Sequence, residues 1–280
     1  MEIDAHHHLW TADYAWLAEP GLEPLRRDYT AAELTAHLDA NGVRAAVLVE
    51  AGRCELAETY EFLALAAAEP RIAGVVGWVS FADSDLPGTL AALRAAPGGD
   101  LLVGVRDQVQ GRPDPDWLDR PEVRACLAAA GAAGLVVDLV VREDQLPACA
   151  RAARDLPGTV FVLDHLGKPR ITPDGLAAWR AAVTPLAACA NVVVKLSGLL
   201  TEAGPDWTVE RIAPFAATAL ELFGADRTML GSDWPVCELV AAYAPTVAAL
   251  TAALPPLTAP EHAAVSGGTA IRTYRLEVPR

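Results

Sequence analysis

The 280-residue chain lacks the basic clusters and long apolar runs that mark nucleic-acid-binding and membrane proteins. Its 22 Lys and Arg face 36 Asp and Glu, which gives a net charge of −14, and they form no basic run. Phosphate binding depends on clustered cations, so a nucleic-acid partner is not expected. The longest apolar stretches, such as residues 45–49 and 135–137, are far shorter than a membrane span and indicate buried strands. We therefore expect neither nucleic acid nor a membrane as a partner.

Cysteine pairs and glycine motifs are also missing. The five cysteines are an odd number and none lies in a Cys-x-x-Cys pair, which argues against a disulfide framework and a sulfur-rich zinc site. No signal peptide precedes the first predicted strand, so we expect a cytoplasmic protein with reduced thiols. No Gly-x-Gly-x-x-Gly turn follows that strand and no Walker-type loop occurs, which argues against a dinucleotide-binding sheet.

What the chain has is a regular alternation of short β-branched runs and Ala/Leu-rich helical segments, with 52% hydrophobic residues to form a core. Eight runs are predicted strands: residues 2–8, 44–50, 72–79, 101–106, 135–141, 160–165, 192–197 and 228–233. Alternating strands and helices imply parallel strands joined by right-handed crossovers. Eight such units favour a closed barrel over a doubly wound sheet. We predict an α/β fold, a single (β/α)₈ TIM-type barrel domain over residues 1–280.

Ionisable side chains gather at the carboxyl ends of these strands, where chemistry occurs in a parallel barrel. Taken strand by strand, they are His6 and His8, Glu50, Arg106 and Asp107, Asp164 and His165, Lys195, and Asp233. Charged groups are costly in a core. A ring of them therefore predicts a functional site at this end of the barrel.

Three adjacent histidines lie in the first predicted strand. Side chains two residues apart point the same way on a strand, so His6 and His8 converge while His7 faces away. Such a run can be the remnant of a purification tag, but a tag lies outside the fold and this run lies within a predicted strand. With Asp233, the two histidines offer the ligand types of a divalent metal such as Zn²⁺, with a position left for water. The alternative is a metal-free site in which the imidazoles are hydrogen-bond donors.

Three further strand-end residues have two interpretations each. Arg106 either anchors a substrate oxygen through its planar guanidinium or pairs with Asp107. Lys195 either contacts the substrate or forms an inward salt bridge. Glu50 is either a site residue or a loop charge. His165, at the mouth of the predicted barrel, is a candidate for the site.

Five motifs, in the same order along the chain, closely resemble those of the amidohydrolase superfamily. They are residues 4–10 (DAHHHLW), 104–106 (GVR) with 113–118 (PDPDWL), 164–169 (DHLGKP), 195–199 (KLSGL) and 231–237 (GSDWPVC). More narrowly, the chain is similar to the branch of sugar-lactone hydrolases that includes the L-fuconolactonases, the L-rhamnonolactonases and the 2-pyrone-4,6-dicarboxylate lactonases. The resemblance covers most of the chain, and the motifs are specific when taken together.

This resemblance implies a barrel enzyme that opens a small sugar-acid lactone by attack of water on the ester carbonyl. Asp233 would be the general base, while His165 and Arg106 would polarise the carbonyl or stabilise the oxyanion. His6, His8 and Asp233 would hold the metal, with His165 as an added ligand or as a hydrogen-bond donor. The expected substrate-binding residues are Lys195, Asp107, Trp234 and Glu50.

The chain also departs from the family pattern at two positions. Asp107 stands where members commonly have His, and Glu50 where they often have Gln. Both changes add negative charge, so the resemblance leaves open which lactone is the substrate. The fifth predicted strand ends without the metal-binding His of the decarboxylase relatives, which counts against the alternative of a decarboxylase acting on an unsaturated carboxylic acid. A barrel that binds a sugar acid without turnover is a further alternative, against which the complete strand-end ring counts.

Overall fold

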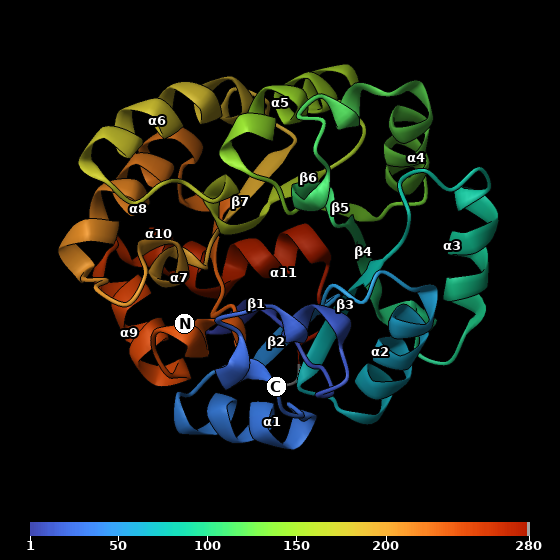
Figure 1. Cartoon of the computed structure of the whole chain (residues 1–280), viewed down its shortest axis with the longest axis horizontal. Helices are drawn as coiled ribbons and strands as arrows, with labels where there is room; N and C mark the ends of the chain where they lie inside the picture. Colours follow the sequence, from blue (N-terminus) through green and yellow to red (C-terminus); the bar gives the residue numbers. More distant parts are fainter. Residues whose placement is uncertain (279–280) are drawn as a thin grey trace.

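Eight parallel strands, paired in chain order, form the centre of the computed structural model, which describes residues 1–278 (Figure 1). They are β1 (Ile3–His7), β2 (Ala45–Val49), β3 (Ile72–Trp78), β4 (Leu102–Asp107), β5 (Val136–Leu139), β6 (Phe161–Leu163), β7 (Val192–Leu196) and β8 (Thr228–Leu230). The sheet closes just beyond β8, where the backbone N–H of Asp233 donates to the carbonyl of His6 at 2.8 Å and that of His8 to the carbonyl of Trp234 at 2.7 Å. The predicted parallel barrel is confirmed.

Helices surround the barrel, as Figure 1 shows. They are α1 (Ala31–Ala40), α2 (Leu56–Ala68), α3 (Leu86–Ala95), α4 (Pro121–Ala132), α5 (Leu146–Asp155), α6 (Pro173–Ala187), α7 (Leu199–Ala203), α8 (Val209–Phe223), α9 (Tyr243–Ala252), α10 (Ala259–Ala263) and α11 (Thr269–Tyr274). Local sequence sets several of their starts: Thr30 before α1 and Thr258 before α10 each form a capping box with the glutamate three residues later. None of the described helices has both the length and the apolar character of a membrane span.

Two buried apolar clusters hold the strands in place. The larger lies between the sheet and the surrounding helices. The smaller fills the barrel with small and β-branched side chains such as Ala45 and Val47, and Tyr274 of α11 joins it. Because apolar side chains fill the interior of the barrel, the polar side chains of the strands lie at the carboxyl ends.

β6 and β8 are shorter than their predicted ranges of 160–165 and 228–233. His165 and Asp233 have left-handed backbone conformations, with φ of 53° and 58°. A strand requires negative φ, so regular pairing stops before these residues. Both side chains consequently lie on irregular backbone at the mouth of the barrel.

Candidate active site

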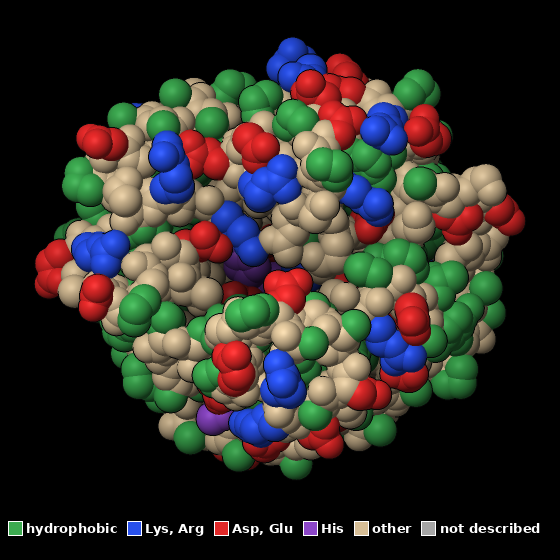
Figure 2. Space-filling view, in the orientation of Figure 1, with side chains coloured by type: hydrophobic (Ala, Val, Ile, Leu, Met, Phe, Trp, Pro, Cys, Tyr) green, Lys and Arg blue, Asp and Glu red, His purple; other side chains and the backbone are tan. Residues whose placement is uncertain are grey.

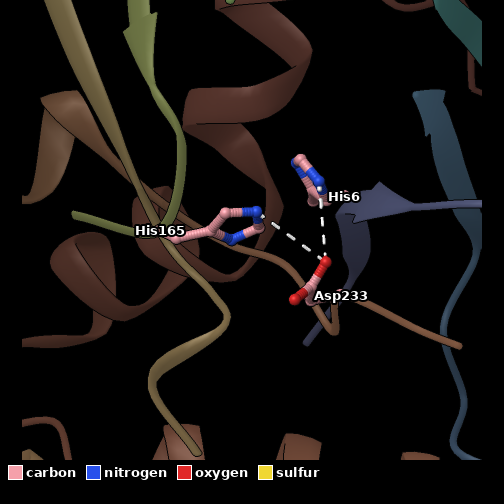
Figure 3. A group of neighbouring side chains, drawn as sticks. All are labelled: His6, His165 and Asp233. Atoms are coloured by element: carbon pink, nitrogen blue, oxygen red, sulfur yellow. Dashed lines mark ion pairs between the residues drawn. The ribbon is translucent and has the colours of Figure 1, made fainter. Parts of the chain in front are cut away.

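Three imidazoles and one carboxylate meet at the carboxyl ends of β1, β6 and β8, and Figure 3 shows how His165 and His6 point toward Asp233. The Oδ1 atom of Asp233 lies 3.7 Å from His6 Nε2, 3.5 Å from His8 Nε2 and 3.8 Å from His165 Nε2. The Nε2 atoms of His6 and His8 are 3.1 Å apart. The structure thus brings together the four residues around which the sequence predicted the chemistry.

Two glycines make room for these rings, and sequence reasoning did not identify them. A Cβ on Gly231 would lie 2.7 Å from the Cβ of His6. A Cβ on Gly198 would lie 2.8 Å from Nδ1 of His165, and Gly198 also has a φ of +68°. The two glycines belong to the motifs at residues 195–199 and 231–237, but only the packing shows why a side chain is not tolerated there.

The protonation states of the site follow from burial and charge. Burial lowers the pKa of His165 to about 4 and takes the pKa of His6 well below its ordinary value of 6.5, so both rings are neutral at neutral pH. Burial alone would raise the pKa of Asp233, but His165 and His8 outweigh it and hold that pKa below its ordinary value of 3.8. Asp233 is therefore ionised, as a general base or a metal ligand must be.

These donors fit a divalent metal ion. Nδ1 of His8 lies 2.9 Å from the carbonyl oxygen of Val49, which can only accept, so the neutral form of the ring presents the lone pair of Nε2 toward Asp233. Metal–ligand bonds of about 2.0–2.1 Å in a tetrahedral site separate the ligand atoms by about 3.3–3.4 Å. The observed separations of 3.1–3.8 Å are close to this spacing. His6, His8, His165 and Asp233 are the residues that could hold the ion.

A buried network of charges supports His6 from behind. Lys195 Nζ lies 3.0 Å from His6 Nδ1, 3.0 Å from Asp164 Oδ1 and 2.5 Å from Asp138 Oδ2. Arg106 extends the network, with Nη1 donating to Asp164 Oδ2 at 2.8 Å and Nε to Glu50 Oε1 at 2.5 Å. Lys195, Asp138, Asp164 and Glu50 are fully buried, so this network orients the site from below its surface.

Sequence reasoning places Asp164 in the strand-end ring without a specific role and does not single out Asp138, although a carboxylate within the apolar run of residues 135–141 is a signal that could have identified it. Burial would raise the pKa of Asp164, but Lys195, His6 and Arg106 together hold it well below its ordinary value of 3.8. Burial raises the pKa of Asp138 to about 6 against the opposing effect of Lys195.

A cavity of about 430 Å³ opens above the site. Its lining includes four predicted site residues, His8, Arg106, His165 and Asp233. It also includes loop residues that sequence reasoning missed, namely Trp16, Glu19, Gln108, Gln110 and Lys168. Figure 2 shows the hollow at the centre of this face, with histidine at its floor and charged side chains around its rim.

Other predicted site residues lie away from this cavity. Asp107 alternates with Arg106 on β4 and faces outward, where its carboxylate accepts from the backbone N–H groups of Phe81 at 3.0 Å and Gln108 at 2.7 Å. Trp234 is fully buried, and its Nε1 donates to Glu238 Oε1 at 2.9 Å. Lys195 and Glu50 are buried beneath the cavity surface, where Lys195 contacts His6 and Glu50 contacts Arg106.

A buried glutamate beside the site makes stability depend on pH. Glu58 of α2 accepts from the backbone N–H of Ala51 at 3.2 Å, and burial, reinforced by Glu50, raises its pKa from 4.5 to about 7. Below pH 4.5 the folded and unfolded chains both carry the proton. As the pH rises from 4.5 to 7 the unfolded chain loses its proton first, so the free energy of unfolding falls. Above pH 7 Glu58 is ionised in the folded chain as well, and the free energy of unfolding has fallen by its full amount.

Glu58→Gln removes this ionisation. We expect the free energy of unfolding of the variant, relative to the parent protein, to increase by roughly 1–3 kcal/mol between pH 4.5 and pH 8. Denaturant unfolding at both pH values measures it. Glu61→Gln, on the exposed side of the same helix, is the control and should show no such change. A Glu58→Gln effect that is the same at both pH values would contradict the prediction.

Fold and site together define a class: a parallel barrel with a His-x-His strand, a third histidine and an aspartate at its mouth. The amidohydrolase family model matches residues 3–276, and the chain belongs to this family. The resemblance that the five motifs indicate is confirmed.

Relatives of this chain are similar over its full length. A protein from Burkholderia multivorans named L-fucono-1,5-lactonase is 39% identical, over 100% of this chain and 97% of its own length. A protein of the same name from Burkholderia ambifaria is 34% identical with the same coverage. A crystal structure of an amidohydrolase from Burkholderia multivorans with bound zinc has a TM-score of 0.91 at 37% identity, and the match covers 99% of this chain and 100% of that one.

Proposed function

We propose that the protein opens a small sugar-acid lactone by attack of water on the ester carbonyl, a reaction of carbohydrate metabolism. The observation that carries the proposal is the ionised Asp233 carboxylate, which lies 3.5–3.8 Å from three imidazole Nε2 atoms at the floor of a cavity. The two full-length relatives named L-fucono-1,5-lactonase support this substrate class.

The side chains have separate roles in this reaction. Asp233 takes a proton from the attacking water, which raises the nucleophilicity of its oxygen. His165 presents Nε2 to the same space, and its Nδ1 lies 2.9 Å from Ser197 Oγ, which fixes the ring. Arg106 lies at the cavity wall with its guanidinium held by Glu50 and Asp164, so a fixed positive charge favours the oxyanion that develops on the carbonyl.

We further propose that His6, His8 and Asp233 hold one zinc ion, with His165 as an added ligand or as a hydrogen-bond donor to the carbonyl. The nitrogen-rich donor set and the zinc-bound structure of a relative support zinc over a harder cation. When bound, the ion supplies Lewis-acid polarisation of the carbonyl. In the metal-free alternative, the imidazoles and Arg106 polarise it directly.

The test is a pH-indicator screen of aldonolactones, because each turnover releases one proton. We expect hydrolysis above the spontaneous rate, with L-fucono-1,5-lactone among the first substrates to try. A panel without turnover but with undiminished ligand binding would favour a non-catalytic sugar-acid-binding barrel. Release of CO₂ from an unsaturated carboxylic acid would favour the decarboxylase, although no histidine follows β5 at residues 140–142.

A small-molecule lactone is the proposed partner of a single domain spanning residues 1–280. We propose a cytoplasmic location, which the five unpaired cysteines support.

A further inference from the structure

Lys168 belongs to an unusual turn that also carries His165. His165, Leu166, Gly167 and Lys168 have consecutive φ values of 53°, 55°, 73° and 54°. Left-handed backbone is unfavourable for residues with a Cβ, so three such residues among four consecutive positions, the fourth being Gly167, require a compensating reason. The turn is held by a hydrogen bond from the N–H of Lys168 to the carbonyl of His165 at 2.9 Å. The indole Nε1 of Trp179 also donates to the carbonyl of Leu166 at 2.7 Å.

The consequence of this turn is that the side chains of His165 and Lys168 face the same cavity. Residues three apart in a helical turn of either hand lie on one side of it. His165 and Lys168 are three apart, and both line the cavity that Asp233 also lines. Backbone strain of this kind is concentrated at functional sites. The strained backbone of this turn therefore indicates that Lys168 takes part in the reaction and is not merely a residue at the rim of the cavity.

Lys168 is also a cation whose protons remain available. The chain has two lysines, and the other, Lys195, is fully buried against Asp138 and Asp164. The guanidinium of Arg106 is committed to the Glu50 and Asp164 side chains and to the Glu50 carbonyl. The Lys168 ammonium has an ion pair with Glu202 at 4.0 Å, too long for a hydrogen bond, and its side chain is 28% exposed.

The proposed reaction needs a proton donor after the attack of water, when the ring of the lactone opens. Opening a lactone breaks the bond between the carbonyl carbon and the ring oxygen, and that oxygen leaves as an alkoxide. An alkoxide is a far stronger base than an amine, so its protonation by an ammonium is downhill. Asp233 could supply the proton that it took from water, but Lys168 offers both a proton and a positive charge.

We infer that Lys168 is a catalytic residue that protonates the ring oxygen as it leaves. Water forms the new bond to the carbonyl carbon and gives one proton to Asp233. The carbon–oxygen bond of the ring then breaks, its electron pair stays on the ring oxygen, and that oxygen takes a proton from the Lys168 ammonium. The new carboxyl group and Asp233 release their protons to solvent, and the Lys168 amine regains one. This inference rests on the proposed lactone hydrolysis.

The test compares Lys168→Met with the parent protein on an aldonolactone and on the matching thiolactone. Loss of a general acid typically costs 10²–10⁴ in rate, so we expect kcat for the oxygen lactone to fall about 100-fold with KM changed less than about threefold. A thiolate leaves without protonation, because thiols have a pKa of about 8.5. On the thiolactone the loss should therefore stay below about tenfold. Lys168→Arg, which keeps a charged donor, should retain more activity on the oxygen lactone than Lys168→Met.

Arg170→Met is the matched control. Arg170 and Lys168 both line a second cavity of about 800 Å³, but Arg170 does not line the cavity above Asp233, and its side chain is 73% exposed. Its kinetics should equal those of the parent protein. Equal losses on both substrates, or full activity of Lys168→Met, would overturn the leaving-group role while leaving lactone hydrolysis intact. Absence of lactone turnover by the parent protein would overturn the proposed function itself, and this inference with it.

Discussion

Replacing Asp233 by asparagine is expected to lower kcat for lactone hydrolysis about 10³-fold while the fold is preserved. An amide has the shape of the carboxylate but cannot take a proton from water, and loss of a general base costs about 10²–10⁴ in rate. The substitution should leave the backbone unchanged, because Asp233 has a φ of 58° and asparagine adopts that left-handed region readily. Its backbone hydrogen bond to His6 also does not involve the side chain.

Steady-state kinetics and thermal unfolding of both proteins measure this prediction. Asp226→Asn is the control, because Asp226 precedes β8 with a side chain that is 88% exposed. It should leave kcat unchanged. A folded Asp233→Asn protein with more than about a tenth of the parent kcat would remove Asp233 from the role of base.

Replacing both His6 and His8 by alanine is expected to abolish bound divalent metal. Asp233 and His165 would remain, and one carboxylate with one imidazole rarely holds such an ion alone. Elemental analysis of untagged protein should find close to one equivalent of metal in the parent and none in the variant. A chelator should suppress parent activity, and Zn²⁺ or Mn²⁺ should restore it.

His6 is fully buried and contacts Lys195, whereas His8 lines the cavity, so the single variant His8→Ala is a second measurement. It removes an imidazole whose Nε2 lies 3.5 Å from Asp233 Oδ1, and it should weaken metal binding strongly. His262→Ala, on exposed α10, is the control and should keep the metal. Full activity of parent protein shown to be free of metal would contradict the metal proposal but not the proposed lactonase activity.

The barrel and the floor of its site could be predicted because both follow from local patterns. Eight short β-branched runs separated by helical segments are sufficient to indicate parallel strands with crossovers. The two-residue period of a strand is equally local, so it places His6 and His8 on one side of β1. The same period puts Arg106 and Asp107 on opposite sides of β4, which the expectation of a substrate contact for Asp107 did not take into account: Arg106 faces the site, and Asp107 faces outward, away from the cavity.

Other features depended on contacts between distant segments. The Lys195 ammonium meets Asp138 and Asp164 only because β5, β6 and β7 are neighbours in the closed sheet. The left-handed conformations of His165 and Asp233 have no local signal, since non-glycine residues rarely adopt them without tertiary support.

The sequence by itself determined the strand count, the direction of the strands and the type of residue at each strand end, because these are properties of nearest neighbours along the chain. Tertiary structure decided which of those residues share a surface. Gln108, Gln110 and Lys168 line the cavity from loops, and loop paths are set by packing rather than by periodicity. Glu50 and Lys195 became supports beneath the site for the same reason: the closed barrel directs their charges into paired, buried positions where an unpaired charge would be too costly.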